Sequence, residues 1–73
     1  MEFKIVVRKD GYVAIAAFDL DDGYYVGERI VWRPEYRVFD VNISAYQAAR
    51  EFAGSLAQFT GFDLLEADGS TPL

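Results

Sequence analysis

Two Asp-Gly pairs set the folding pattern of this chain, because each falls between two stretches that have the character of a β-strand. Asp10-Gly11 separates residues 2–8 from 12–19, and Asp22-Gly23 separates 12–19 from 24–32. Asp-Gly is favoured in two-residue hairpin turns, since both central residues of such a turn adopt positive φ. The sequence therefore predicts antiparallel strands that reverse direction at both pairs.

A turn at Asp10-Gly11 divides the apolar side chains between two faces of the sheet. One face is expected to carry Phe3, Ile5 and Val7 opposite Phe18, Ala16 and Ala14, in that order. The other face is expected to carry Val13, Ile15, Ala17, Val26, Ile30 and Trp32. A slip of one residue in the pairing would exchange the two faces. Because a single helix covers only one face, the second is expected to be covered by another copy, by a different protein or by the C-terminal segment.

Turn and cap residues mark the elements that follow. Arg33-Pro34-Glu35-Tyr36 suits a type I turn, after which residues 37–41 are predicted to form a fourth strand. Ser44 and Gln47 have the spacing of a capping box, which predicts a helix from about Ala45 to Phe59.

The helix is expected to be amphipathic, with an apolar stripe formed by Ala45, Ala49, Phe52, Leu56 and Phe59. Gly61 suits the position after the helix, and residues 62–65 have the character of a short fifth strand. The expected fold is α+β, an antiparallel meander of about four strands followed by one helix packed on one face. We predict a single domain over residues 1–66 and a flexible C-terminal tail at 67–73.

Composition limits the chemistry that the chain can perform. It is 52% apolar and 16% aromatic, unlike a disordered segment, and it contains neither cysteine nor histidine. Their absence excludes zinc sites built on thiolate or imidazole and nucleophilic catalysis of the Ser-His or Cys-His type. Asp19, Asp21 and Asp22 lack the spacing of an EF-hand loop, and neighbouring acids on one turn cannot face each other across a sugar-sized cleft. We therefore expect no enzymatic activity, no metal and no cofactor.

The charge of the chain is negative and unevenly distributed. The net charge is −5, with seven acidic and six basic residues in 1–37 but five acidic and one basic in 38–73. Such a chain is not expected to bind nucleic acid directly, and the sequence indicates no pocket for a small molecule. It shows neither a membrane-spanning stretch nor a signal peptide, so we expect a cytoplasmic protein with no membrane association.

The segment from Asp10-Gly11-Tyr12-Val13-Ala14 to Asp19-Leu20, followed by a glycine and later by an alanine-rich helix, resembles HicB-type antitoxins. The resemblance implies a β-β-β-α core and a protein that neutralises a partner toxin by binding it. The sequence departs from that pattern in three ways: Asp-Asp-Gly replaces the usual Pro-Gly-Cys-like turn, an extra strand is expected before the helix, and no DNA-binding tail follows.

These features predict a non-enzymatic protein-binding module. We expect a small acidic inhibitor of the kind that phages and mobile elements encode, such as an anti-CRISPR protein, which occludes a basic nucleic-acid-binding surface on a larger partner. Acidic side chains would imitate phosphates and aromatic ones would anchor the contact. The predicted partner-binding residues are Asp19, Asp21, Asp22, Tyr24, Tyr25, Glu28 and Trp32. The alternative is a homo-oligomeric structural or antitoxin-like protein, such as a homodimer, with the second sheet face buried between copies.

Overall fold

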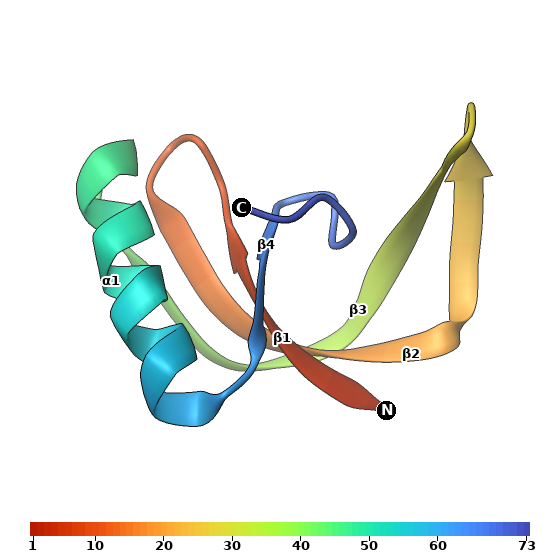
Figure 1. Cartoon of the computed structure of the whole chain (residues 1–73), viewed down its shortest axis with the longest axis horizontal. Coiled ribbons are helices and arrows are strands. Elements are labelled where there is room, and N and C mark those ends of the chain that lie inside the picture. The colour runs from red at the N-terminus through yellow and green to blue at the C-terminus, as the bar shows by residue number, and fades with distance from the viewer.

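The computed structural model shows an α+β fold in which one helix packs on one face of a four-stranded sheet (Figure 1). The elements are β1 (Glu2–Val7), β2 (Tyr12–Val26), β3 (Arg29–Asn42), α1 (Tyr46–Thr60) and β4 (Asp63–Glu66). The strand order is β3-β2-β1-β4, and β4 runs parallel to β1 while the other neighbours are antiparallel. The structure describes the backbone of residues 1–73 and all side chains except those of Leu20, Asp22 and 29–33. The predicted fold class is confirmed, with three strands before the helix and the fourth after it.

The first hairpin loop is one residue longer than predicted. The Gly11 N–H donates to the Arg8 carbonyl at 3.0 Å, and the Arg8 N–H donates to the Tyr12 carbonyl at 2.8 Å. Lys9 and Asp10 are therefore the central residues of the turn, and Gly11 follows with a φ of 92°. A three-residue loop of this kind has its left-handed residue in the third position, which explains the glycine there.

The longer loop exchanges the two faces of β2 relative to β1, which corrects the predicted register. Phe3, Ile5 and Val7 lie opposite Ala17, Ile15 and Val13, instead of Phe18, Ala16 and Ala14. The core under the helix consists of Ile5, Val7, Val13, Ile15, Ala49 and Ala53. Ala14, Ala16 and Phe18 on the opposite face are buried within the single chain. The face away from the helix therefore carries Ala14, Ala16 and Phe18, whereas we predicted Val13 and Ile15 there.

The second Asp-Gly pair is not a turn. β2 continues through Asp22-Gly23 to Val26, and the chain reverses at Gly27 and Glu28. Gly27 has a φ of 65°, as the first central residue of a tight hairpin turn requires. Reversal at Gly27 lets the strand-forming residues on either side of it pair with one another, which a turn at Gly23 would prevent.

The predicted type I turn at residues 33–36 is also part of a strand. β3 runs through this segment, and Glu35 and Val38 are each left over between consecutive pairs with β2. Such bulges bend a strand and increase its twist. The predicted third strand is thus divided at Gly27-Glu28: its first part ends β2, and its second part, 29–32, joins the predicted fourth strand in β3. Because β3 lies at the edge of the sheet, these bulges and Pro34 also hinder pairing with another sheet.

The helix begins one residue later than predicted and without the capping box. Its N-cap is Ala45, which makes no side-chain hydrogen bond. Ser44 has a φ of 64°, and its N–H and hydroxyl donate to Asn42 Oδ1 at 2.8 and 3.2 Å. The serine therefore stabilises the loop between β3 and α1 instead of capping the helix. The C-terminal cap is as predicted: Gly61, with a φ of 76°, donates its N–H to the Ala57 carbonyl at 2.8 Å.

The helix packs on the sheet through small side chains. Ala49 and Ala53 are fully buried, and Leu56 packs beside them. The predicted stripe is correct for Ala49 and Leu56. Phe52 and Phe59, however, lie outside the core, and Phe59 is 90% exposed. Alanine allows the helix to approach the sheet closely, so these two bulky side chains lie outside the contact.

The segment after β4 turns back along that strand. The Glu66 N–H donates to the Thr71 carbonyl at 2.8 Å, and the Leu73 N–H donates to the Leu64 carbonyl at 3.2 Å. The short strand predicted at 62–65 is present as β4, and residues 67–73 follow it as a hydrogen-bonded return. The mobility of 67–73 in solution stays a prediction, which NMR relaxation can test.

Candidate partner-binding surface

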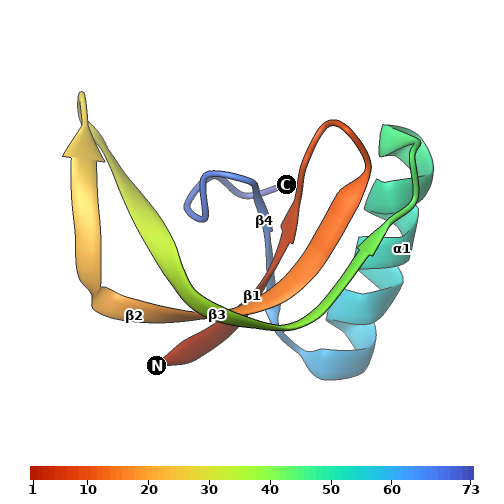
Figure 2. The same ribbon diagram turned by 180° about the vertical axis from the view of Figure 1, so that it is seen from behind.

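The outer part of the β2–β3 hairpin, residues 19–34, extends away from the rest of the fold and is named the arm (Figure 2). It begins at an irregularity between the pairs Phe18–Pro34 and Gly23–Trp32, where β2 has four residues and β3 has one. Extra residues on one strand bend a hairpin, and the ribbon bends away from α1 in both views (Figures 1 and 2). The Asp-rich stretch therefore forms the bend of the arm and not its turn.

The acidic side chains of the arm differ in their surroundings. The Asp19 carboxylate accepts the N–H of Asp21 at 3.0 Å, a local bond that fixes the irregular backbone. Asp19 is half-buried, whereas Asp21 and Glu28 are exposed, Glu28 at the hairpin tip. The side chain of Asp22 lies outside the described residues.

The predicted aromatic anchors lie on the outer half of the arm. Tyr24 and Tyr25 are 44% and 73% exposed, and the neighbouring Val26 is 52% exposed. The arm is a two-stranded ribbon, an arrangement that has no third layer to bury its side chains. Tyr24 and Tyr25 follow one another on β2 near the tip that carries Glu28, and they therefore lie on opposite faces of the ribbon. The side chain of Trp32, which was predicted as a further anchor, lies outside the described residues.

A second group of exposed aromatic side chains, which the sequence prediction missed, lines the rim of the core on the helix side. Phe3 contacts Tyr36 edge-on at 6.4 Å between ring centroids and stacks on Phe62 at 5.8 Å. Phe39 stacks on Phe52 at 6.3 Å. These five residues are named the aromatic band. Sequence reasoning placed Phe3 and Phe52 in the core, and only the observed register and helix rotation place them at its rim.

The first hairpin loop carries an exposed ion pair. Arg8 Nε donates to Asp10 Oδ1 at 3.2 Å and Arg8 Nη2 donates to Asp10 Oδ2, while the Tyr12 N–H donates to Asp10 Oδ1 at 3.2 Å. The hydrogen bond from Arg8 is the main cause that lowers the pKa of the Asp10 carboxyl, and the same bond raises the pKa of the Arg8 guanidinium. Because both groups face solvent, the pair contributes little to folding.

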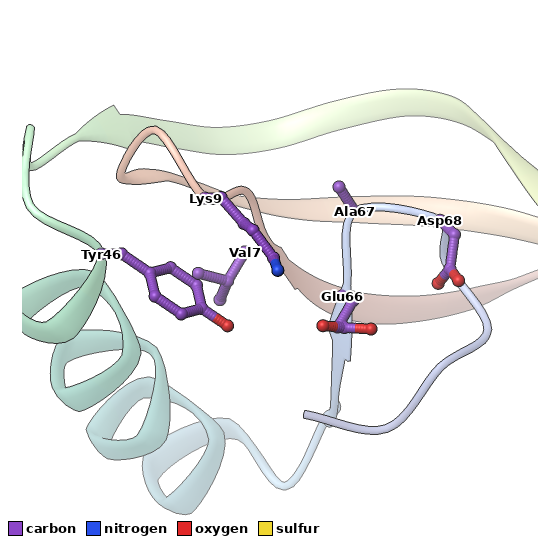
Figure 3. Close-up of a pocket in the computed structure, with 6 residues that line it drawn as sticks. All are labelled: Val7, Lys9, Tyr46, Glu66, Ala67 and Asp68. Atoms are coloured by element: carbon purple, nitrogen blue, oxygen red, sulfur yellow. The ribbon is translucent and has the colours of Figure 1, made fainter.

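A small cavity of about 200 Å³ opens between this loop, the start of α1 and the end of β4 (Figure 3). The Lys9 ammonium and the Tyr46 hydroxyl point toward the strand end that carries Glu66 (Figure 3). The neighbouring Asp68 carboxylate accepts N–H groups of its own turn, at 3.0 and 2.9 Å. Among the described side chains, no group of three or more potential ligands could hold a metal ion.

No family model matches the chain, and no curated protein or solved structure matches it either. The resemblance to HicB-type antitoxins thus rests on the quoted residues alone. The observed order of three strands and a helix agrees with the β-β-β-α core that the resemblance implies, although a fourth strand follows here. In the part of the chain that the structure describes, no helix is both long and apolar enough to cross a membrane.

Proposed function

We propose that this chain is a non-enzymatic protein-binding module that contacts a larger partner through the arm. The observation that carries the proposal is the exposure of Tyr24, Tyr25 and Val26 on a ribbon outside the core. Tyr24 and Val26 share one face of the ribbon and Tyr25 lies on the other. Large exposed apolar side chains on one element are typical of interaction sites, and tyrosine is among the residues that dominate binding energies. A partner would also stabilise the ribbon, since two strands alone are only marginally stable in water.

The partner surface that fits the arm best is basic. Residues 19–34 contain four acidic and two basic side chains, a net of −2, within a chain of net charge −5. On this ground the module is an acidic inhibitor of the kind that phages and mobile elements encode, anti-CRISPR proteins among them, and it covers a basic nucleic-acid-binding surface. Because the Asp19 carboxylate already accepts the backbone N–H of Asp21, the side chains of Asp21 and Glu28 make the main contacts with cations. The absence of cysteine suits a cytoplasmic location.

A homo-oligomer is the second candidate. Its original argument, an uncovered second sheet face, is weakened because Ala14, Ala16 and Phe18 are already buried. The aromatic band now favours it, since exposed rings beside a core can pack against those of a second copy. Light scattering at micromolar concentration tests this candidate: a dimer supports it, and a monomer contradicts it.

Capture from a nuclease-treated lysate of the host, with bound proteins identified by mass spectrometry, tests the proposed function. The baits are the wild-type chain, a Tyr24→Ser/Tyr25→Ser variant and an Asp21→Asn/Glu28→Gln variant. Phe59→Ser is the matched control, because Phe59 is an exposed aromatic on α1, outside the arm.

We expect the wild-type chain and Phe59→Ser to retain one nucleic-acid-binding protein. The tyrosine variant should lose it, and the wild-type complex should dissociate at 1 M NaCl, where the screening length falls to about 3 Å. The charge variant should bind more weakly and with a flatter salt dependence. Equal capture by the tyrosine variant, or no capture by the wild-type chain, would contradict the proposal.

A further inference from the structure

The sheet face opposite α1 contains a cavity of about 380 Å³. This volume lies within the range of about 300–1,000 Å³ that is typical of small-molecule sites. Its accessible apolar lining comes from Val6, Pro34 and Ala67, while Ala14 and Ala16 lie buried beside it. Its polar lining comes from Arg8, Tyr12 and Arg37.

Tyr12 holds two arginines at the rim of this cavity. The guanidinium carbons of Arg8 and Arg37 lie 4.7 and 5.9 Å from the centroid of the Tyr12 ring, within the range of cation–π attraction. Arg37 Nη1 also donates to the Tyr12 hydroxyl, which donates to Asp40 Oδ2 at 3.1 Å. Two positive groups, one from the first hairpin loop and one from β3, therefore lie beside one tyrosine ring.

Both arginines keep hydrogen-bond donors for a ligand. Arg8 uses Nε and Nη2 for Asp10, and Arg37 uses Nη1 for Tyr12, with Asp40 Oδ2 at 3.8 Å. An arginine side chain carries more N–H groups than these contacts occupy, and no described residue accepts from Arg8 Nη1 or Arg37 Nη2. Exposed ion pairs are weak, so a bound anion can compete with the two aspartates.

We propose that this cavity binds a small aryl anion, with a flat ring against the apolar lining of Val6, Pro34 and Ala67 and a carboxylate or phosphate group held by Arg8 and Arg37. The guanidinium fork matches both headgroups in a bidentate arrangement. The cavity is larger than a bare phosphate or carboxylate needs, and its apolar lining suits a ring. A nucleic-acid strand fits less well, because its many phosphates would meet a chain of net charge −5.

NMR titration of the ¹⁵N-labelled chain tests the site, with phenyl phosphate, benzoate, inorganic phosphate and the neutral benzyl alcohol as probes. We expect saturable shifts of the Ala14 and Ala16 amides with at least one aryl anion, and only small shifts with inorganic phosphate or benzyl alcohol. A response to phenyl phosphate alone supports an aryl phosphate such as phosphotyrosine. A response to benzoate alone supports an aryl carboxylate.

Three variants assign the binding to the arginines. Arg37→Gln should weaken the responding anion at least about tenfold, because it removes a charged hydrogen-bond donor. Arg50→Gln on α1 is the matched control and should leave the affinity unchanged. Asp40→Asn should raise the affinity, because it removes the carboxylate that competes for Arg37. If Arg37→Gln loses the dispersed NMR spectrum of a folded chain, Asp40→Asn provides the test instead.

Three results would overturn the site: no saturable shift with either aryl anion at millimolar concentration, equal shifts with benzyl alcohol, or unchanged affinity in folded Arg37→Gln together with unchanged affinity in Asp40→Asn. Because the cavity and the tyrosines of the arm are tested with different residues and probes, failure of one proposal does not affect the other.

Discussion

Val13 and Val26 are the same residue type on the same strand, yet Val13 is fully buried and Val26 is 52% exposed. Val13 lies in the body of the protein, residues 1–18 and 35–73, where α1 covers the sheet. Val26 lies on the arm. Both segments have strand-forming sequences, so only packing distinguishes them. The comparison indicates that the body holds the fold together, whereas the arm leaves its apolar side chains exposed to solvent.

Gly11 in the body should show the largest effect of a single substitution, and Gly27 is its counterpart on the arm. A Cβ at Gly11 would lie 2.7 Å from the Ser44 backbone nitrogen, whereas a Cβ at Gly27 would meet no atom within 4 Å, although both glycines have positive φ. Gly11→Ala combines left-handed strain with overpacking and should lower the free energy of unfolding by about 3 kcal/mol. Gly27→Ala carries the strain alone, about 1 kcal/mol. Urea unfolding measures both free energies. Equal losses would contradict the difference in packing between the body and the arm.

The two valines provide the next test. Val13→Ala should lower the free energy of unfolding by about 2 to 3 kcal/mol, since it removes buried methyl groups and leaves a cavity in the core. Val26→Ala should change it by less than about 0.5 kcal/mol, as is usual for surface positions. The same denaturant titration applies. A loss above about 1.5 kcal/mol at Val26 would show that the arm belongs to the cooperative core.

The smallest effect is expected at the ion pair of the body. The pKa of Asp10 is lowered in the folded state, mainly by the hydrogen bond from Arg8, so its contribution to stability is present above the unfolded value of about 3.9. That contribution is lost as the pH falls through the folded pKa. The difference in unfolding free energy between the wild-type chain and Asp10→Asn should therefore shrink below about pH 4. A difference that stays constant in acid would contradict this assignment.

Local chemistry made part of the fold predictable from the sequence. Gly61 ends the helix as expected, because a left-handed C-cap depends on a single residue. The register was not predictable, since Asp10-Gly11 fits a two-residue turn and a three-residue loop equally well, and the one-residue difference exchanges the sheet faces. The capping box failed because Ser44 is held by Asn42 across the connection from β3.

The candidate sites depend still more on distant partners. The sequence identified Tyr24 and Tyr25, since neighbouring tyrosines beside carboxylates suggest a contact surface. It could not show that the Asp-rich stretch is a bend, because that depends on how β2 pairs with Pro34. It also could not show that Arg8 and Arg37 both lie against the Tyr12 ring, which happens because β1 and β3 flank β2.

Hydrogen exchange of the backbone amides tests the separation of body and arm most directly. If the body alone is cooperative, the amides of Ile5 and Ile15 exchange only through global unfolding, and Val13→Ala lowers their protection by its full effect on stability. The paired amides of Tyr24 and Val26 then exchange through local opening, with much lower protection that Val13→Ala does not change. Equal protection of arm and body, falling together in Val13→Ala, would contradict the account.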